Sequence, residues 1–556
     1  MGFTWVAVLF LWQEPIDLHR VVEPGPTAAE RRGVAAQASF ERERRFRLPA
    51  TGGGGGRCDE RIGRFCYWYD DRDTTLPSEP LSLLDLRMRL LGTLREAAAE
   101  EPESAWLTGQ LVRYLVEHGE RDSAVVAASR CGASIWWCEA VLGFALHADE
   151  RDEEADTAFR RATRAMPDSL RCAWTDWTRI LEPGLANRYG ALDCAARLEL
   201  SDTVLWLAKP LLSRPGNVIR SELLSRRVVA ALGNVSRSPY AISWGRDMEE
   251  LVLRYGWSRR FSVVDHRSWS LEGPSVVGHQ RAPAYPFLPD LAHPDDGAPW
   301  VDLLGADRPR ARFSPGYIDR FESTDAFQLA RFPRGDSSIV VGAIDPGSRF
   351  GRDSRFDVAL AAGAGPENVA VERHDSTARL AGLQVAVAGE VLAASVELSA
   401  VGGRQFLRGR EYYAPIDREA PIVLSDLLLF VPGDGLPSTL HDAAALALPS
   451  NRISRGTPVG IYWETTGGAG DSTVVAVSVS PARRGLLGRL ARGLSVVRRD
   501  APITLEWTVT TSRAAATGRA FELDLERLAP GRYHIVLEVQ AGGASATVDR
   551  DIRLTN

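Results

Sequence analysis

The stretch Leu142–Pro167, LGFALHADERDEEADTAFRRATRAMP, decides how the N-terminal half of the chain folds. Small residues stand at Gly143 and Ala155, where the two helices of a hairpin would cross closely. Phe159 and Ala162 fall on the apolar face of the second helix, and the proline at the end of the stretch stops that helix. The stretch therefore predicts two helices packed as a hairpin.

The same residues, in order and spacing, resemble the signature of the tetratricopeptide repeat family. The resemblance is strong over about 34 residues and loose over 81–235. It implies a groove that binds a partner protein or peptide, with Trp137, Phe144 and His147 on the face that lines it. The alternative is that Trp137 and Phe144 pack against an adjacent helix, which is the commoner position of aromatic side chains at helical spacing.

Helical periodicity runs from Leu81 to about Leu232, with breaks at Gly119, Gly132, Asp149 and Pro167. We therefore expect helical repeats over 81–235. Before them, 27–80 should hold a helix, a glycine linker and a loop closed by cysteines. The helix at Thr27–Arg47 mixes arginines with glutamates, which favours a helix exposed to solvent.

The cysteines all lie in the N-terminal part of the chain, and none belongs to a CxxC pair. The spacing therefore does not indicate a zinc ribbon, a thioredoxin-type site or haem attachment. An even number within one region favours disulfides in an oxidising compartment, and six buried free thiols are the alternative. Nearness in sequence predicts the pairs Cys58–Cys66, Cys131–Cys138 and Cys172–Cys194.

From Phe327 onward the hydrophobic period changes to two. In Ile503–Val509 and Tyr533–Val539 apolar and polar residues alternate, so each segment predicts a strand with one buried and one wet face. We expect an Ig-like sandwich at 327–415 and a second at 416–556, after a connecting region at 236–326 that is rich in proline and tryptophan. The prolines at Pro415, Pro421 and Pro432 predict a linker between the strands of the two sandwiches. The expected fold class is α then β, multidomain, with helical repeats followed by Ig-like β-sandwiches.

Two other segments, Glu249–Trp257 (EELVLRYGW) and Leu523–Tyr533 (LDLERLAPGRY), carry a second resemblance. They are similar to segments that open and close the β-rich region of bacterial exported proteins with the domain called GWxTD. The motif that names that domain is absent from this chain. The resemblance implies a location in the cell envelope and no particular activity.

Two segments are candidates for contact with a membrane. Within residues 1–14, Phe3–Trp12 forms an apolar run of the length of a signal-peptide core, too short for a membrane-spanning helix. No basic residue precedes the run, and no A-x-A cleavage site follows it. The segment 483–499 holds six arginines and no acid. As a helix it would be basic and amphipathic, but its glycines favour a loop or a hairpin arm.

Neither the composition nor the sequence motifs indicate a catalytic, metal-binding or nucleic-acid-binding function. The chain is 45% hydrophobic and 25% charged with a net charge of -6, which is typical of globular proteins and gives no basic field for nucleic acid. Lys209 is the one lysine among 66 basic residues. The histidines form no HExxH motif, and no GxSxG elbow is present. Asp345, Asp353 and Asp357 lack EF-hand spacing, so no metal, cofactor or catalytic set is predicted.

These observations together predict a non-enzymatic interaction or scaffold protein of the bacterial cell envelope. It would be exported to the periplasm or envelope and would bind a partner through its helical repeats. One alternative is a hydrolase with its catalytic set on sandwich loops, for example His441 and Asp442 with a distant serine. Another is a polysaccharide-binding protein that uses Trp463 and Trp507. Free thiols would instead favour a cytoplasmic location.

Overall fold

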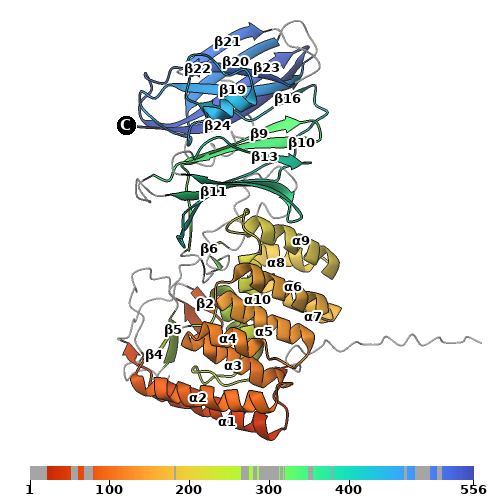
Figure 1. Cartoon of the computed structure of the whole chain (residues 1–556), viewed down its shortest axis with the longest axis vertical. Helices are drawn as coiled ribbons and strands as arrows, with labels where there is room; N and C mark the ends of the chain where they lie inside the picture. The colour runs from red at the N-terminus through yellow and green to blue at the C-terminus, as the bar shows by residue number, and fades with distance from the viewer. Residues whose placement is uncertain are drawn as a thin grey trace, which may run out of the picture. The chain divides into compact units, whose positions relative to one another are not determined.

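The computed structural model describes residues 22–51, 60–67, 79–180, 183–258, 260–264, 275–279, 285–286, 312–313, 317, 320–347, 355–376, 380–468, 473–482, 501, 503–509 and 516–556. The chain divides into two compact units (Figure 1). The helical unit comprises Met1–Lys209, Pro215–Pro289 and Leu303–Gly316; the β unit comprises Pro210–Arg214, Asp290–Asp302 and Tyr317–Asn556. The predicted order of α then β is confirmed.

The helical unit is a layered set of helices with a few short strands. Its helices are α1 (Ala28–Phe46), α2 (Leu81–Glu100), α3 (Ala105–His118), α4 (Arg121–Ala128), α5 (Ile135–Ala148), α6 (Asp152–Ala165), α7 (Asp168–Trp174), α8 (Pro183–Gly190), α9 (Cys194–Ala208), α10 (Val218–Asn234) and α11 (Arg246–Tyr255). Its strands are β1 (Ala50–Thr51), β2 (Glu60–Ile62), β3 (Phe65–Tyr67), β4 (Arg260–Val264), β5 (Ser275–His279), β6 (Tyr285–Pro286) and β7 (Arg312–Phe313).

Helix ends in this unit are set by the residues that the sequence places there. Ser104 accepts a hydrogen bond from the backbone N–H of Leu107 and caps the start of α3. Gly119 ends α3 with a φ of 94°, a left-handed conformation that glycine adopts without strain. Asp149 is the C-cap of α5. These positions explain why the helix breaks could be read from the sequence.

The helix pair predicted around Gly143 is present as α5 and α6. A Cβ atom added at Gly143 would lie 2.9 Å from the ring of Phe159, so the crossing has no room for a larger side chain. Ala155, Phe159 and Ala162 are buried on the inner face of α6. The close approach of the two helices therefore depends on the small residues that the sequence pattern singled out.

The β unit contains two sandwiches. The strands of the first are β8 (Phe321–Ser323), β9 (Phe327–Arg334), β10 (Ser337–Ile344), β11 (Phe356–Gly365), β12 (Asn368–Ser376), β13 (Leu383–Ala388), β14 (Ala393–Ala400) and β15 (Phe406–Tyr412). Its sheets have the orders β13-β10-β9 and β12-β11-β14-β15-β8. Neighbours pair antiparallel, except that β8 runs parallel to β15.

The second sandwich contains β16 (Ile422–Leu424), β17 (Leu428–Phe430), β18 (Arg452–Ser454), β19 (Val459–Gly467), β20 (Thr473–Pro481), β21 (Ile503–Val509), β22 (Thr517–Leu523), β23 (Gly531–Ala541) and β24 (Ala544–Thr555), with the short helix α12 (Leu440–Ala445). In one sheet β19 pairs with β16, β17 and β22; the other has the order β18-β24-β23-β20-β21. The segment from Pro415 to Pro432, predicted as a proline-rich linker, thus contributes two strands.

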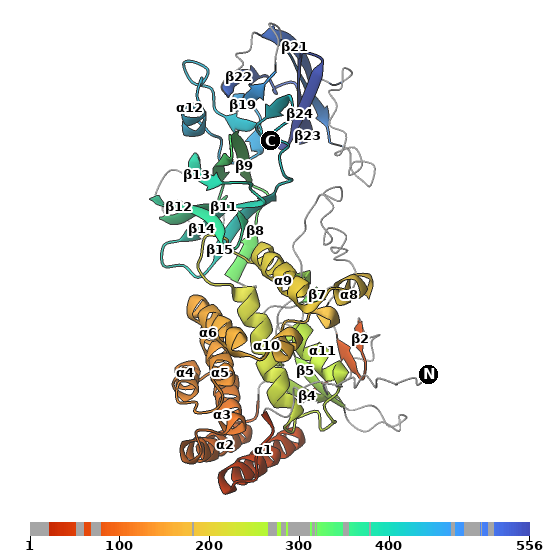
Figure 2. The same ribbon diagram turned by 90° about the vertical axis from the view of Figure 1, so that its right-hand side faces the viewer.

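The four sheets of the β unit are stacked (Figures 1 and 2). Clusters of buried apolar side chains lie between successive sheets of the stack. Leu329 of β9 belongs to the core between the two sheets of the first sandwich. Its neighbours Ala330 and Phe332 belong to a second core that is shared with Phe430 and Tyr462 of the second sandwich. Successive residues of a strand point to opposite faces, so β9 is buried on both sides.

Candidate functional site

The three side chains predicted to line a partner-binding groove all lie on α5, and residues of this same chain cover them. Trp137 is fully buried, and its indole N–H donates to the carbonyl of Ala105 at 2.9 Å. Phe144 is 8% exposed. His147 Nε2 lies 2.7 Å from a carboxylate oxygen of Glu222 on α10. In this structure these side chains are core and helix contacts, so a partner could reach them only if α10 moved.

Helix α10 packs against α3, α5 and α6 and occupies the face expected to be open (Figure 2). A Cβ atom at Gly109 of α3 would lie 2.6 Å from the side chain of Leu232 on α10. Gln110 donates to the carbonyl of Leu232 at 3.2 Å, and Trp106 donates to that of Val235 at 3.3 Å. This helix is therefore an integral part of the core of the helical unit.

The surroundings of Glu222, which contacts His147, favour its ionised form. Burial alone would raise the pKa of Glu222. The Arg226 guanidinium, 2.6 Å away, and the hydrogen bond with His147 outweigh that cost and hold the pKa well below its usual range. Glu222 is therefore a carboxylate whose partners are both supplied from within the helical unit.

Two of the three predicted cysteine pairs are present as disulfides. Cys131 and Cys138 have their Cα atoms 5.4 Å apart, and Cys172 and Cys194 have theirs 5.8 Å apart. Both distances lie in the range that a disulfide needs. The predicted pair of Cys58 with Cys66 stays a prediction, because Cys58 lies outside the residues that the structure describes.

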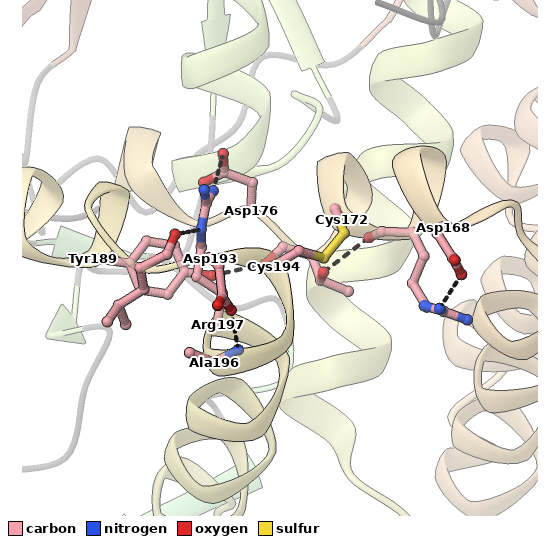
Figure 3. The surroundings of a disulfide bond; sticks show 11 residues. Asp168, Cys172, Asp176, Tyr189, Asp193, Cys194, Ala196 and Arg197 are labelled. Atoms are coloured by element: carbon pink, nitrogen blue, oxygen red, sulfur yellow. Dashed lines mark hydrogen bonds and ion pairs between the residues drawn. A yellow bond between two sulfur atoms is a disulfide. The ribbon is translucent and has the colours of Figure 1, made fainter. Parts of the chain in front are cut away.

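The Cys172–Cys194 disulfide joins α7 to the first residue of α9 (Figure 3). The Asp193 side chain caps α9 by accepting from the backbone N–H of Ala196 at 2.9 Å. Arg197 donates to the Leu192 carbonyl at 2.9 Å, and its guanidinium lies 3.4 Å from Asp176. The disulfide therefore closes a segment whose ends are also fixed by polar contacts.

Two arginines satisfy backbone carbonyls inside this closed segment. Residues 175–177, between α7 and the 3-10 turn at Thr178–Ile180, belong to no helix, and a backbone carbonyl without a helical donor needs another partner. Arg227 of α10 donates to the carbonyls of Trp174, at 3.2 Å, and of Asp176. Arg254 of α11 donates to those of Ile180 at 3.1 Å and Arg179 at 2.7 Å. Burial lowers the pKa of Arg227, which the facing Glu249 carboxylate partly offsets.

A buried ionic network ties α1 to α2 and α3. Arg44 is fully buried; its guanidinium lies 2.6 Å from Glu117 and 3.1 Å from Glu79. Arg87 of α2 donates to Glu79 at 2.7 Å. The prediction of a solvated helix at Thr27–Arg47 is therefore wrong for one face of α1, because acids distant in sequence neutralise Arg44 there.

The same network perturbs its carboxyl groups in opposite directions. Burial raises the pKa of Glu41, although Arg44 and the Tyr114 hydroxyl, which donates to it at 2.6 Å, partly oppose the change. Burial would raise the pKa of Glu117 as well, but Arg44 and Arg87 outweigh it, so that pKa is lowered. Such a buried ionic network fixes the positions of the helices relative to one another. Its acidic and basic side chains are already paired with one another.

Three residues of the alternative functions, Trp463, Trp507 and Asp442, take part in packing or capping, whereas His441 is exposed. Trp463 is 1% exposed and meets Trp507 edge to face at 6.3 Å, so the two rings do not form a flat platform for a sugar. Thr439 caps the start of α12 by accepting from the Asp442 backbone N–H at 3.2 Å, and the Asp442 carboxylate accepts from the Thr439 hydroxyl at 2.7 Å. Among the residues described, no group of three or more acidic, histidine or cysteine side chains could hold a metal ion.

No helix in the described part of the chain is both long and apolar enough to cross a bilayer. The apolar run at Phe3–Trp12 and the basic segment 483–499 lie outside that part. Membrane contact through either of them stays a prediction.

Comparisons with known proteins add no family. No family model matches the chain. No curated protein matches it either. A solved structure described as "Anomalous substructure of Titin-A168169" is 11% identical and covers 42% of this chain and 100% of its own, with a TM-score of 0.12. At that TM-score the likeness does not inform fold or function.

Proposed function

We propose that the protein is a non-enzymatic scaffold of the bacterial cell envelope that binds a partner protein through its helical unit. The observation that carries the proposal is a tight helical hairpin, α5 and α6, flanked by disulfides at Cys131–Cys138 and Cys172–Cys194. The hairpin supports membership of the tetratricopeptide-like class, whose stacked helices present extended binding surfaces. The disulfides support an oxidising compartment, and hence export.

The surface offered to the partner is then the outside of the hairpin layer, because α10 occupies its inner face. Two large apolar side chains lie at the Cys131–Cys138 disulfide: Val126 of α4, before the closed loop, is 51% exposed, and Ile135, inside it at the start of α5, is 73% exposed. Apolar anchors of this kind contribute most of the energy of many protein interfaces. The disulfide fixes the loop, which lowers the entropic cost of binding.

The test is purification of the full-length protein from its native envelope, with the mass of any complex measured by light scattering. We expect a complex of fixed stoichiometry that is lost in Ile135→Asp and Val126→Asp. Leu505→Asp is the matched control, because Leu505 is a similarly exposed apolar side chain, 40% exposed, in the β unit. If the complex is lost only in His147→Ala, the partner binds the face of α5 on which the sequence predicted the groove.

Turnover on a panel of hydrolase substrates would overturn the scaffold proposal outright. So would a complex that survives Ile135→Asp, Val126→Asp and His147→Ala but is lost with Leu505→Asp, since the β unit would then be the binding surface. Alkylation of six cysteines in unreduced native protein would remove the argument for export.

A further inference from the structure

The β unit binds a short segment of the chain that connects two helices. Residues Pro210–Arg214 lie between α9 and α10 in sequence, but by their contacts they belong to the β unit. They form no helix or strand, and the first four of them are buried. Irregular segments usually run over the surface of a protein, so the burial of this one needs a specific cause.

The cause is a row of side chains that crosses four neighbouring strands of the first sandwich. Arg373 of β12 pairs with Ala359 of β11, which pairs on its other side with Glu397 of β14. Glu397 in turn pairs with Arg408 of β15. Residues paired directly across a sheet share one face, and Arg410, two residues after Arg408, shares it too. We call the four polar members of this group the backbone cradle: Arg373, Glu397, Arg408 and Arg410.

Glu397 is the centre of the cradle and is 3% exposed. It lies on the outer face of its sheet, because its neighbours Val396 and Leu398 belong to the core of the first sandwich. Its carboxylate accepts from the backbone N–H groups of Leu212, at 2.6 Å, and Ser213, at 3.1 Å. Burying a carboxylate is costly without such donors, so an occupant that supplies N–H groups is favoured over an empty site.

The arginines of the cradle bind carbonyl groups of the same segment. Arg408 and Arg410 both donate to the carbonyl of Pro210, at 2.6 Å and 3.1 Å. Arg373 donates to the carbonyl of Ser213. Arg410 also lies 3.9 Å from the Glu397 carboxylate. The contacts to the segment are made to main-chain groups, so they depend on the path of its backbone and not on the identity of its side chains.

The segment adds to the outer face of a sheet whose own core is complete. Leu211 and Leu212 are 5% and 3% exposed, yet neither belongs to the cores of the two sandwiches or to the core that the sandwiches share. The chain returns to solvent directly after Ser213, since Arg214 and Pro215 are exposed. The segment can therefore leave the cradle without opening the core of a sandwich.

We propose that the backbone cradle is a peptide-binding site, that residues 210–214 occupy it as an internal ligand, and that a bent segment of a partner protein can take their place. The partner segment would supply two consecutive N–H groups for Glu397, carbonyl groups for the arginines and two adjacent aliphatic side chains. This site is separate from the helical surface proposed above and does not depend on it.

The internal ligand determines how well a free peptide competes. Because it is part of the chain, its effective concentration at the cradle is on the order of millimolar. Leu212→Asp puts a charge where the structure buries a leucine, so it should expel the internal ligand and leave the cradle open to a peptide. Leu436→Asp is the matched control, because Leu436 belongs to the β unit, lies outside the cradle and is 48% exposed.

Binding of a fluorescent peptide to the full chain, followed by anisotropy, tests the proposal. The probe has the sequence of residues 208–216, AKPLLSRPG. Leu212→Asp should bind it saturably and at least about tenfold more tightly than the unsubstituted chain or Leu436→Asp does. A peptide methylated at the two nitrogens that correspond to Leu212 and Ser213 cannot donate to Glu397 and should not bind.

Hydrogen exchange of the unsubstituted full chain is a second measurement and needs no variant. The amides of Leu212 and Ser213 donate to Glu397 and should exchange slowly. An excess of unlabelled peptide should make both exchange faster, because a displaced segment is exposed to solvent.

Three results would overturn the proposal. One is the absence of saturable binding to Leu212→Asp when circular dichroism shows that the variant is folded. Another is equal binding of the methylated peptide, since contacts other than those with Glu397 would then account for the binding. The third is unchanged exchange at Leu212 and Ser213 with the peptide in excess. That result would make the segment a fixed part of the β unit, and it decides the matter if Leu212→Asp does not fold.

Discussion

Replacing both Cys172 and Cys194 by serine should lower the free energy of unfolding of the helical unit by about 3 kcal/mol. A disulfide stabilises mainly by restricting the unfolded chain, and the restriction grows with the length of the closed loop. For the sequence separation of 22 here, chain-entropy arithmetic gives about 3.4 kcal/mol. For the separation of 7 between Cys131 and Cys138 it gives about 2.4 kcal/mol.

Contacts in the folded structure indicate that removing the Cys172–Cys194 disulfide should cost nearly all of the stability that the chain-entropy arithmetic gives for it. The segment inside the larger loop keeps its backbone partners without the disulfide, because Arg227 and Arg254 bind its carbonyls from α10 and α11. The native state of the variant should therefore relax little. The loss should come from the greater freedom of the unfolded chain.

Urea unfolding followed by the helical circular dichroism signal measures the change. No cysteine follows Cys194 in the sequence, so unfolding of the β unit should keep its midpoint in the variant and in reductant. The variant without Cys131 and Cys138, both replaced by serine, is the comparison and should lose about 1 kcal/mol less. An unchanged helical midpoint, or equal shifts in both units, would refute the reasoning.

Three other predictions concern burial and charge, and each can be measured by urea unfolding of the full chain. Arg44→Ala should cost about 3–5 kcal/mol because it strands buried carboxylates, whereas Arg32→Ala, in an exposed ion pair, should cost under about 1 kcal/mol. Ala155→Leu should cost about 1–3 kcal/mol by overpacking the α5–α6 crossing, and an unchanged midpoint would contradict the crossing. The stability of the β unit should fall by roughly 3 kcal/mol as the pH rises from about 4.5 to about 7, because over that range folded Glu411 retains a proton that the unfolded chain has released. Glu411→Gln should remove that dependence, and a slope that persists in the variant would assign it to other groups.

Features that depend on neighbours in sequence could be predicted. The α5–α6 hairpin rests on Gly143, Ala155 and Phe159, which act within one helical turn of the crossing. Strict alternation located β21 and β23. β23 buries one face in the core, whereas β21 is only partly covered and its Leu505 is 40% exposed. In these cases the residues that form the local sequence pattern are also the residues that pack in the folded chain, so the pattern alone was enough to predict the element.

Strand β17, which is buried on both faces, escaped prediction for the opposite reason. Residues Leu427–Phe430 are all apolar and fully buried, so β17 shows no alternation. The prolines around it, at Pro421 and Pro432, favoured a linker instead. Because β17 packs against both β9 and β19, its burial is set by strands far away in the chain.

The candidate site was predictable only in part. That Trp137, Phe144 and His147 share one helix follows from their spacing, but that α10 covers them does not. Helix α10 buries residues around much of its circumference, so its sequence does not indicate which face meets α5. The buried Arg44 likewise depends on Glu79 and Glu117, which are distant in sequence and could not be paired with it in advance.

The stacking of four sheets has a consequence for the order in which the chain is synthesised. A ribosome releases β9 and β10 well before β17, α12 and β19, and a first sandwich completed at β15 would still present Ala330, Phe332 and Val341 to water. That apolar face is covered only when Phe430 and Tyr462 have emerged. The nascent β unit therefore passes through an interval in which it is vulnerable to aggregation, and a holding chaperone acting during that interval would improve its yield.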